Sequence, residues 1–342
     1  MKHTFVLAFF ILIASLFALS CEEQDTTGTN DGTTYKAATG PSGGGASGGG
    51  KRIAVIPKGT THVFWKTVEA GVRDAGKELG VAVDWQGPLK EDDRGQQIGL
   101  VEQFISNNVS GIVLAPLDAT ALQEPVAAAK AKNIPVVIFD SPLNGEAGKD
   151  FVSLVATDNK KGGEMGAAEL ARLLNGKGKV VLLRYNVGSA STDLREQGFL
   201  EAIAKHPGIE VIEKSRYAGA TVGEAQQSAE NLLDRLKQAD GVFCSNESVT
   251  QGMLNVLVAN GLAGKMKFVA FDTAPTIVEA IRNGQIHATV AQNPRKMGYL
   301  AVKTMVDHLN GTTAPPMVDT GCALVTKENL DKPEIKSILQ GP

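Results

Sequence analysis

The chain has 342 residues, of which 43% are hydrophobic and 21% are charged, and its formal net charge at pH 7 is -3. That length is enough for two hydrophobic cores, so we expect two lobes. The lack of a basic charge excess argues against a nucleic acid partner, because binding to a polyanion depends on a positive field.

The N-terminal segment has the features of an export signal. Residues 1–20 carry one Lys and then an apolar run that is too short for an ordinary membrane-spanning helix, and small residues come before Cys21. Residues 18–21, with the sequence ALSC, are similar to the lipobox of bacterial lipoproteins, in which the Cys is acylated. We therefore expect a signal peptide over residues 1–20 and lipidation of Cys21. The alternative is an ordinary signal peptide that is cut nearby.

Residues 21–50 are predicted to be a flexible tether, because they are polar, rich in Gly, Ser and Thr, and have almost nothing to bury. After Cys21 only Cys244 and Cys322 remain, each alone in its segment, which favours two buried free thiols over a disulfide. There is no metal-ligand spacing and no phosphate-binding loop motif. We expect neither a metal nor a cofactor.

From residue 52 onward, short β-branched runs alternate with helical patterns. The first series predicts strands over 53–57, 81–85, 111–116 and 135–140, with helices over 64–79, 93–108 and 119–133. The second predicts strands over 151–158, 179–186, 209–215, 241–246, 267–272 and 287–292, with helices over 162–175, 193–205, 223–238, 248–260, 275–283 and 295–309. Glycines at 80, 176, 261, 284 and 311 mark helix ends. This pattern is typical of an α/β fold with two doubly wound parallel-sheet lobes.

Ligands of open parallel sheets bind beyond the carboxyl ends of the strands, and the residues at those positions are unusually polar here. They are Lys58, Asp140, Asn246, Asp272 and Gln292, with Arg195 in the helix that follows another strand. Carboxylates, amides and cations together suit a dense array of neutral hydroxyl groups.

Two rings, Phe64 and Trp65, follow the first strand and could pack against the apolar C–H faces of a sugar. The alternative is that the rings pack against the sheet. In the same way, Asp140, Asn246 and Asp272 could simply cap helices. Capping explains the cations and Gln292 less well, so the sequence favours a sugar site.

At these residues the chain resembles the type I periplasmic sugar-binding proteins of ABC transporters, above all the ribose-binding branch. The resemblance extends from residue 51 to residue 330 and is carried by the segments IAVIPKGTTHVFW, IPVVIFDS, VATDNKKGGEMGA, LREQGF, GVFCSNE, FVAFDTAP and ATVAQNP. It implies that both rings stack on the ligand. It also implies hydrogen bonds to the ligand from Asp140, Arg195, Asn246, Asp272 and Gln292.

Four positions depart from the ribose-binding pattern, one of them Ala220, near which those proteins have a third aromatic residue. Ser141 stands where those proteins typically have Arg, Lys58 replaces a small polar residue, and His62 replaces an Asn. Lys58 could supply the missing cation, although a point charge is no equivalent of a planar fork. His62 is expected either to contact a ligand hydroxyl or to cap the following helix. The ligand therefore stays open among ribose, another pentose or hexose, and the furanosyl autoinducer that some relatives bind.

The resemblance further implies that the chain crosses between the lobes three times, near Thr157, Gln292 and Cys322. The predicted first lobe comprises residues 51–157 and 293–322, and the second comprises residues 158–292 and 323–342. Hinge closure would bury a monosaccharide between the lobes, and a permease with its ATPase would read the closed form. We expect a monomer in the periplasm or at the outer face of the cytoplasmic membrane, held there only by its lipid anchor.

Other functions are open to the same fold. A protein that presents its sugar to a chemoreceptor cannot be separated from a transport component by sequence. A glycosidase with Asp140 and Asp272 as acid and base is disfavoured, because neighbouring cations are expected to hold both carboxyl groups ionised. A transcriptional repressor is disfavoured too, since a signal and a tether occupy the place of a helix-turn-helix.

Overall fold

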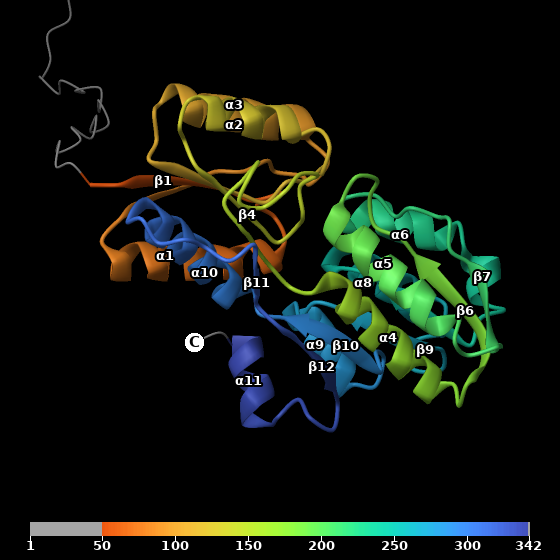
Figure 1. Ribbon diagram of the computed structural model, residues 1–342. Helices are drawn as coiled ribbons and strands as arrows, with labels where there is room; N and C mark the ends of the chain where they lie inside the picture. Colours follow the sequence, from red (N-terminus) through yellow and green to blue (C-terminus); the bar gives the residue numbers. More distant parts are fainter. Residues whose placement is uncertain (1–49, 341–342) are drawn as a thin grey trace, which may run out of the picture. The chain divides into compact units, whose positions relative to one another are not determined.

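The computed structural model describes residues 50–340. The predicted signal peptide, Cys21 and all of the predicted tether before Gly50 lie outside the described residues. The described residues belong to one compact unit, and within it the strands form two six-stranded sheets (Figure 1). This architecture confirms the predicted fold class.

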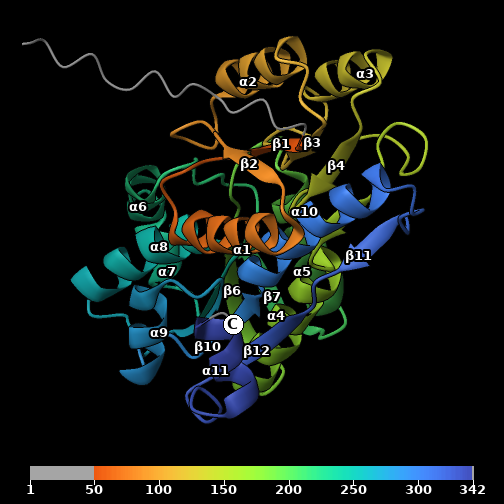
Figure 2. The ribbon, with the colours of Figure 1, turned by 90° about the vertical axis from the view of Figure 1, so that its left-hand side faces the viewer.

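The first sheet has the strand order β11-β5-β4-β3-β1-β2, and all its neighbouring strands are parallel. Its strands are β1 (Arg52–Ile56), β2 (Ala82–Trp85), β3 (Gly111–Leu114), β4 (Val136–Phe139), β5 (Leu154–Ala156) and β11 (Met317–Asp319). Helices α1 (Val63–Leu79) and α10 (Pro294–Leu309) cover one face, and α2 (Arg94–Ser106) and α3 (Gln123–Ala131) cover the other (Figure 2). Burial on both faces explains why β3 and β4 are continuously apolar.

The second sheet has the order β12-β10-β9-β8-β6-β7, and only β12 runs antiparallel to its neighbour. Its strands are β6 (Lys177–Leu183), β7 (Gly208–Glu213), β8 (Gly241–Cys244), β9 (Lys267–Phe271), β10 (Ala288–Gln292) and β12 (Cys322–Thr326). Helices α4 (Asn159–Leu173) and α5 (Ala190–Ile203) pack on one face. The other face carries α6 (Val222–Glu230), α7 (Leu233–Leu236), α8 (Glu247–Ala259), α9 (Pro275–Arg282) and α11 (Pro333–Gln340).

The chain passes between the two sheets three times: from β5 to α4, from β10 to α10, and from β11 to β12. The third passage differs from the prediction. Cys322 was expected to end the first lobe, but it begins β12 and pairs with Gln292 in the second sheet. Gly321, with φ of 78°, turns the chain just before it.

The expected helix ends agree with the structure. The glycines at 80, 176, 261, 284 and 311 have φ between 64° and 88°, the left-handed region in which a Cβ is unfavourable. The predicted helix over 223–238 is interrupted after Glu230 and continues as α7. The strands β11 and β12 and the helix α11 were not predicted.

Cys244 and Cys322 are both free thiols. Cys244 is buried, as expected, but Cys322 is only half-buried. Between Gly50 and Gln340 the structure contains no helix that combines the length and the apolar character needed to cross a membrane. In the same range, no group of three or more His, Cys, Asp or Glu side chains is arranged to hold a metal ion.

Candidate ligand-binding site

A cavity of about 30 Å³ lies between the lobes, where the carboxyl ends of the two sheets meet. Nine of the ten predicted site residues line it: Lys58, His62, Phe64, Trp65, Asp140, Arg195, Asn246, Asp272 and Gln292. The tenth, Ser141, is not among the lining residues but lies next to them, since its Oγ accepts a hydrogen bond from Ser191 N at 3.1 Å. The lining residues that sequence reasoning missed are Glu91, Tyr185, Ser191, Thr192 and Glu247.

On the first lobe, Lys58 and Asp140 form a buried ion pair. Lys58 Nζ lies 3.3 Å from Asp140 Oδ2, and both side chains are almost fully buried. Lys58 also reaches the second lobe, where it donates to Ser191 Oγ at 2.8 Å. Asp140 directly follows β4 with φ of 60°. Asp is among the few residues that tolerate such a backbone, and none of the hydrogen bonds of its side chain caps a helix.

On the second lobe, Asp272 and Gln292 are joined by a direct hydrogen bond. Gln292 Nε2 donates to Asp272 Oδ1 at 2.7 Å, and the other carboxylate oxygen accepts from Glu247 N at 2.8 Å. Asp272 also follows its strand in the left-handed region, with φ of 71°. Asn246 caps α8, because its Oδ1 accepts from Val249 N at 3.2 Å. For Asn246 the capping interpretation therefore holds, although its side chain also faces the cavity.

Arg195 is fixed from two sides. Its Nε donates to Asn159 Oδ1 at 2.8 Å and its Nη1 donates to the Ser245 carbonyl at 3.0 Å. The guanidinium also lies 4.0 Å from the centre of the Phe271 ring, a favourable cation–π arrangement. These contacts leave the guanidinium of Arg195 little freedom to reorient. Its remaining N–H groups therefore point into the cavity in a fixed direction, ready to donate hydrogen bonds.

The aromatic residues divide between the core and the cavity. Trp65 is 2% exposed and meets the rings of Phe64 and Phe139 edge-on, with centroids 4.9 and 6.1 Å away. It belongs to the apolar core between α1, α10 and the first sheet, as the packing alternative proposed, and it also forms part of the cavity wall. Phe64 is half-buried and lines the cavity as well.

Glu91 stands in the loop after β2 and pairs with His62, whose Nδ1 is 2.7 Å from Glu91 Oε1. Burial disfavours the imidazolium, but the carboxylate outweighs burial and raises the pKa of His62 to about 9. Burial likewise opposes ionisation of Glu91, yet His62, Lys58 and the Trp65 N–H lower its pKa to about 2. His62 is the N-cap residue of α1, but its side chain makes no capping hydrogen bond.

Glu247 bridges the lobes at the start of α1. Its two carboxylate oxygens accept from Val63 N and Phe64 N, each at 3.0 Å. The first turn of a helix has unpaired N–H groups and a positive dipole end, both of which favour a carboxylate there. The residue before Val63 is His62, which is not a typical N-cap residue. This was the one sign in the sequence that a distant side chain could accept hydrogen bonds from the first turn of α1.

The two aspartates are affected by burial as well as by the neighbouring cations that the sequence indicated. Burial raises the pKa of Asp140, and the opposing effects of Lys58 and Arg195 do not cancel it. Burial raises the pKa of Asp272 as well, against Arg195 and Gln292. Burial thus opposes the effect of the cations on both carboxyl groups, a contribution that the sequence argument left out.

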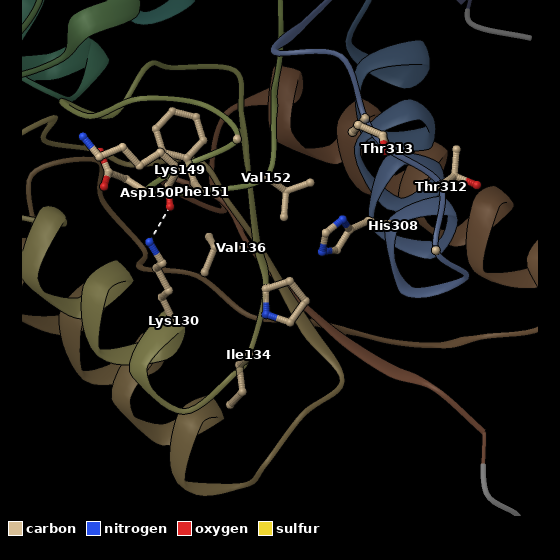
Figure 3. A pocket seen from close by; sticks show the side chains of 14 residues that line it. Lys130, Ile134, Val136, Lys149, Asp150, Phe151, Val152, His308, Thr312 and Thr313 are labelled. Carbon is tan, nitrogen blue, oxygen red and sulfur yellow. Dashed lines mark hydrogen bonds between the residues drawn. The ribbon is translucent and has the colours of Figure 1, made fainter.

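A larger cavity of about 420 Å³ lies in the first lobe, bounded by α3, by β4 and by the C-terminal end of α10 (Figure 3). Its wall is mainly apolar, with Ile134, Val136 and Phe151, and His308 and Lys130 lie on opposite sides of it. The Lys130 amine is exposed and donates to the carbonyl of Lys149. This cavity does not bring buried carboxylates, amides and cations together, so the interlobe cavity is the better site for a hydroxyl-rich ligand.

Comparison with known proteins agrees with this geometry. Residues 53–313 match the family described as the periplasmic binding protein domain. The chain is 32% identical to the D-allose-binding periplasmic protein of Escherichia coli strain K12 over 74% of this chain and 83% of that protein. It is 30% identical to the ribose import binding protein of Bacillus subtilis strain 168 over 78% of this chain and 84% of that protein.

Solved structures give the same result. A carbohydrate transporter solute-binding protein from Agrobacterium radiobacter, in complex with D-arabinose, is 33% identical and has a TM-score of 0.81. The match covers 86% of this chain and all of that one. A solute-binding protein from Agrobacterium vitis with bound D-fucose is also 33% identical with a TM-score of 0.81, over 84% of this chain and 99% of that one. The chain thus belongs to the periplasmic binding protein family, among relatives named as sugar-binding proteins of ABC transporters.

Proposed function

We propose that this protein captures a monosaccharide in the interlobe cavity and delivers it to an ABC permease. The observation that carries the proposal is the convergence of buried polar side chains from both lobes on one cavity. The first lobe contributes Lys58 and Asp140, and the second contributes Arg195, Asp272 and Gln292. The relatives named for D-allose and ribose, and the neighbours bound to D-arabinose and D-fucose, support the same ligand class.

The ligand enters while the lobes are apart. A cavity of about 30 Å³ has room for roughly two water molecules, at ~10–15 Å³ of accessible volume each, and not for a sugar ring. Sugar hydroxyls would therefore replace hydrogen bonds that the side chains now make with one another, such as Gln292 to Asp272. The half-buried ring of Phe64 and the edge of Trp65 would contact the apolar face of the sugar.

The proposed cellular setting follows from the family and from the N-terminus. Periplasmic binding proteins of importers act outside the cytoplasmic membrane, and the export signal with Cys21 would place and anchor the protein there. Its partners would be a permease and the ATPase of that permease. The relatives are named as binding proteins, and we propose that this chain too is a carrier without an activity of its own.

A ligand screen tests the proposal. Thermal unfolding is measured with pentoses, hexoses, polyols and furanosyl signals, because a ligand at a hundredfold excess over its Kd stabilises the fold by ~2.7 kcal/mol. We expect at least one monosaccharide to raise the melting temperature clearly. If none of them does, the protein is not a monosaccharide carrier.

Calorimetry on a site variant then tests the site. Asp272→Asn is preferred to Ala, because Asn tolerates the left-handed backbone of this position. Replacing a buried carboxylate that accepts hydrogen bonds from ligand hydroxyls costs roughly 1–3 kcal/mol, so we expect affinity to fall about 5- to 150-fold. Asp331→Asn, whose side chain is 81% exposed, is the control and should bind normally. Equal affinities in the two variants would mean that Asp272 does not contact the sugar.

A further inference from the structure

We infer that Glu91 is a positioning residue that orients the Trp65 and His62 side chains in the binding site and ties them to Tyr185 of the opposite lobe. Insofar as it concerns ligand affinity, this inference rests on the proposed function. The hydrogen-bond geometry of Glu91, described below, does not depend on which ligand binds.

Three side-chain donors converge on this one carboxylate. Glu91 Oε1 accepts from Trp65 Nε1 at 2.7 Å and lies 2.7 Å from His62 Nδ1, while Oε2 accepts from the Tyr185 hydroxyl at 3.0 Å. Glu91 is only 7% exposed. Three of the roughly four lone-pair sites of the carboxylate thus have partners in the protein, so the role that we infer for Glu91 is to position these neighbours.

The bond to Trp65 sets the orientation of the cavity wall. A buried indole N–H needs an acceptor, and Glu91, which lines the same cavity, provides it. Together with the edge-on contact to Phe139, the bond fixes the plane of the ring. A ring held in one plane presents a fixed surface to a sugar.

The bond to Tyr185 crosses between the lobes. Tyr185 follows β6 of the second sheet and is 1% exposed. Its own backbone is anchored, because Tyr185 N donates to Glu196 Oε1 at 2.9 Å. The hydroxyl can reach Glu91 only when the two lobes are together. This bond therefore forms on closure of the lobes and connects Tyr185 to the side chains that Glu91 holds on the first lobe.

The pair with His62 fixes a cation at the cavity. The groups that face His62 are Glu91 from the loop after β2, Glu247 from the start of α8 and Asp272 from the end of β9, and Lys58 faces Glu91 from the loop after β1. Because Nδ1 is engaged with Glu91, Nε2 is the ring nitrogen that can donate to a ligand oxygen. Loss of the Glu91 charge would leave a buried imidazole that prefers the neutral form.

Gly59 provides independent support for a dedicated place for this side chain. A Cβ on Gly59 would lie 2.8 Å from Glu91 Cγ, a distance that real Cβ atoms do not adopt. The Cγ is the middle of the side chain and not its flexible end, so Glu91 could not keep its position beside any larger residue.

The first test uses the full chain without a ligand. The titration of His62 is followed by NMR in the wild type, in Glu91→Gln and in Asp118→Asn, which removes the carboxylate of another ion pair in the same lobe. We expect His62 to titrate near pH 9 in the wild type and in Asp118→Asn, and at or below its ordinary value of ~6.5 in Glu91→Gln. A wild-type His62 that titrates near 6.5 would overturn the inference, whatever the protein binds.

The second test measures affinity for whichever of D-ribose, D-allose and D-arabinose binds the wild type. Glu91→Gln should bind about 10- to 100-fold more weakly, because a charge-assisted bond and the orientation of the ring are lost together. The loss should grow between pH 6 and pH 8, whereas wild-type affinity should stay level over this range. Unchanged affinity and an unchanged pH profile in Glu91→Gln would contradict the inference.

A third variant separates the two roles of Glu91 and remains informative if Glu91→Gln does not fold. Tyr185→Phe removes the hydrogen bond from Tyr185 to Glu91 and leaves the His62–Glu91 pair intact, so affinity should fall while His62 still titrates near pH 9. A Tyr185→Phe protein with wild-type affinity would refute the link across the lobes. If none of the three sugars binds the wild type, the screen has rejected the proposed ligand class, and the His62 titration alone decides whether Glu91 positions the site.

Discussion

At the scale of single residues, the cavity depends on buried ions that stabilise one another. Removing a charged group from water is costly unless a partner of opposite charge and further hydrogen bonds replace the water. Glu91 and His62 meet that condition, and so do Lys58 and Asp140. Breaking either pair by removing one partner leaves a buried charge alone, which is why changes here should act on stability as well as on binding.

The His62–Glu91 pair predicts how stability depends on pH. The pKa of His62 is raised to about 9, so its contribution is complete below its unfolded value of ~6.5 and is lost as the pH rises toward 9. The pKa of Glu91 is lowered to about 2, so its contribution is complete above ~4.5 and is lost as the pH falls toward 2. The pair therefore stabilises the fold most between about pH 4.5 and 6.5.

Urea unfolding at pH 6 and pH 9 measures the His62 part of this effect. The free energy of unfolding should fall between these values in the wild type, with His62 accounting for up to ~3 kcal/mol of the loss. His62→Gln should show a correspondingly smaller fall. An identical pH dependence in the two proteins would mean that His62 is not paired in the folded state.

Sequence reasoning found the residues whose positions are set locally and missed those set by long-range packing. Asp140 and Asp272 directly follow apolar strands, and parallel strands bring their carboxyl ends to one edge. Glu91 stands in a charged loop run, LKEDD, which is typical of a solvated surface. Its burial depends on Trp65 and Tyr185, far away in sequence, and no local pattern indicates that.

At the scale of elements, two pairs of helices are held together by reciprocal glycines. A Cβ on Gly71 of α1 would lie 1.9 Å from the Arg295 carbonyl oxygen of α10, and one on Gly298 would lie 2.2 Å from the Val68 oxygen. The pair α4 and α5 repeats the arrangement with Gly163 and Gly198, at 1.9 and 2.1 Å from backbone oxygens of the partner helix. These contacts position α1, which carries Trp65, and α5, which carries Arg195.

Alanine at these glycines should therefore be destabilising. Gly71→Ala and Gly163→Ala would push two backbones apart, and we expect each to lower the free energy of unfolding by ~1–3 kcal/mol or more. Gly99→Ala in α2 is the matched control: its Cβ would meet nothing within 4 Å, and replacing a helical Gly should gain ~0.5–1 kcal/mol. Thermal or urea unfolding decides, and a tolerated Gly163→Ala would contradict the close contact.

The strands and helices that could be predicted are those with strong patterns of their own. Runs such as GIVL and GVFC are buried on both faces and leave little choice of structure. The late strand β11 is short and mostly exposed, and in β12 the apolar run CALV is mostly half-buried, so neither is a strand buried on both faces. They form because a neighbouring strand supplies their hydrogen bonds, which only the folded lobes reveal.

At the scale of the whole described unit, direct contacts join the two lobes. Glu247 accepts hydrogen bonds from the start of α1, and Tyr185 donates to Glu91. Lys58 donates to Ser189 and Ser191. Arg94 donates to the Val187 carbonyl, and Ala119 N donates to the Gly188 carbonyl. A ligand shifts the equilibrium between open and closed lobes only by binding one of the two states more tightly. The contacts within the chain therefore set how much binding free energy the sugar must contribute to closure.

Glu247 offers the clearest test of this balance. In Glu247→Gln the amide oxygen can still accept a hydrogen bond from one of the two N–H groups of α1. The amide NH₂ would face the second N–H group, and two donors cannot bond to each other, so the closed arrangement loses stability. We expect small-angle scattering from the ligand-free variant to give a larger radius of gyration than the wild type. The exposed Glu146→Gln serves as the control and should scatter like the wild type.

The same variant should bind its sugar more weakly, because apparent affinity falls in proportion to the competent fraction. Glu247 also lines the cavity, so a weaker affinity alone would not separate closure from direct contact with the sugar. The ligand-free scattering separates them, since no sugar is present to be contacted. A variant that binds weakly yet scatters like the wild type would make Glu247 a contact of the sugar and not a clamp between the lobes.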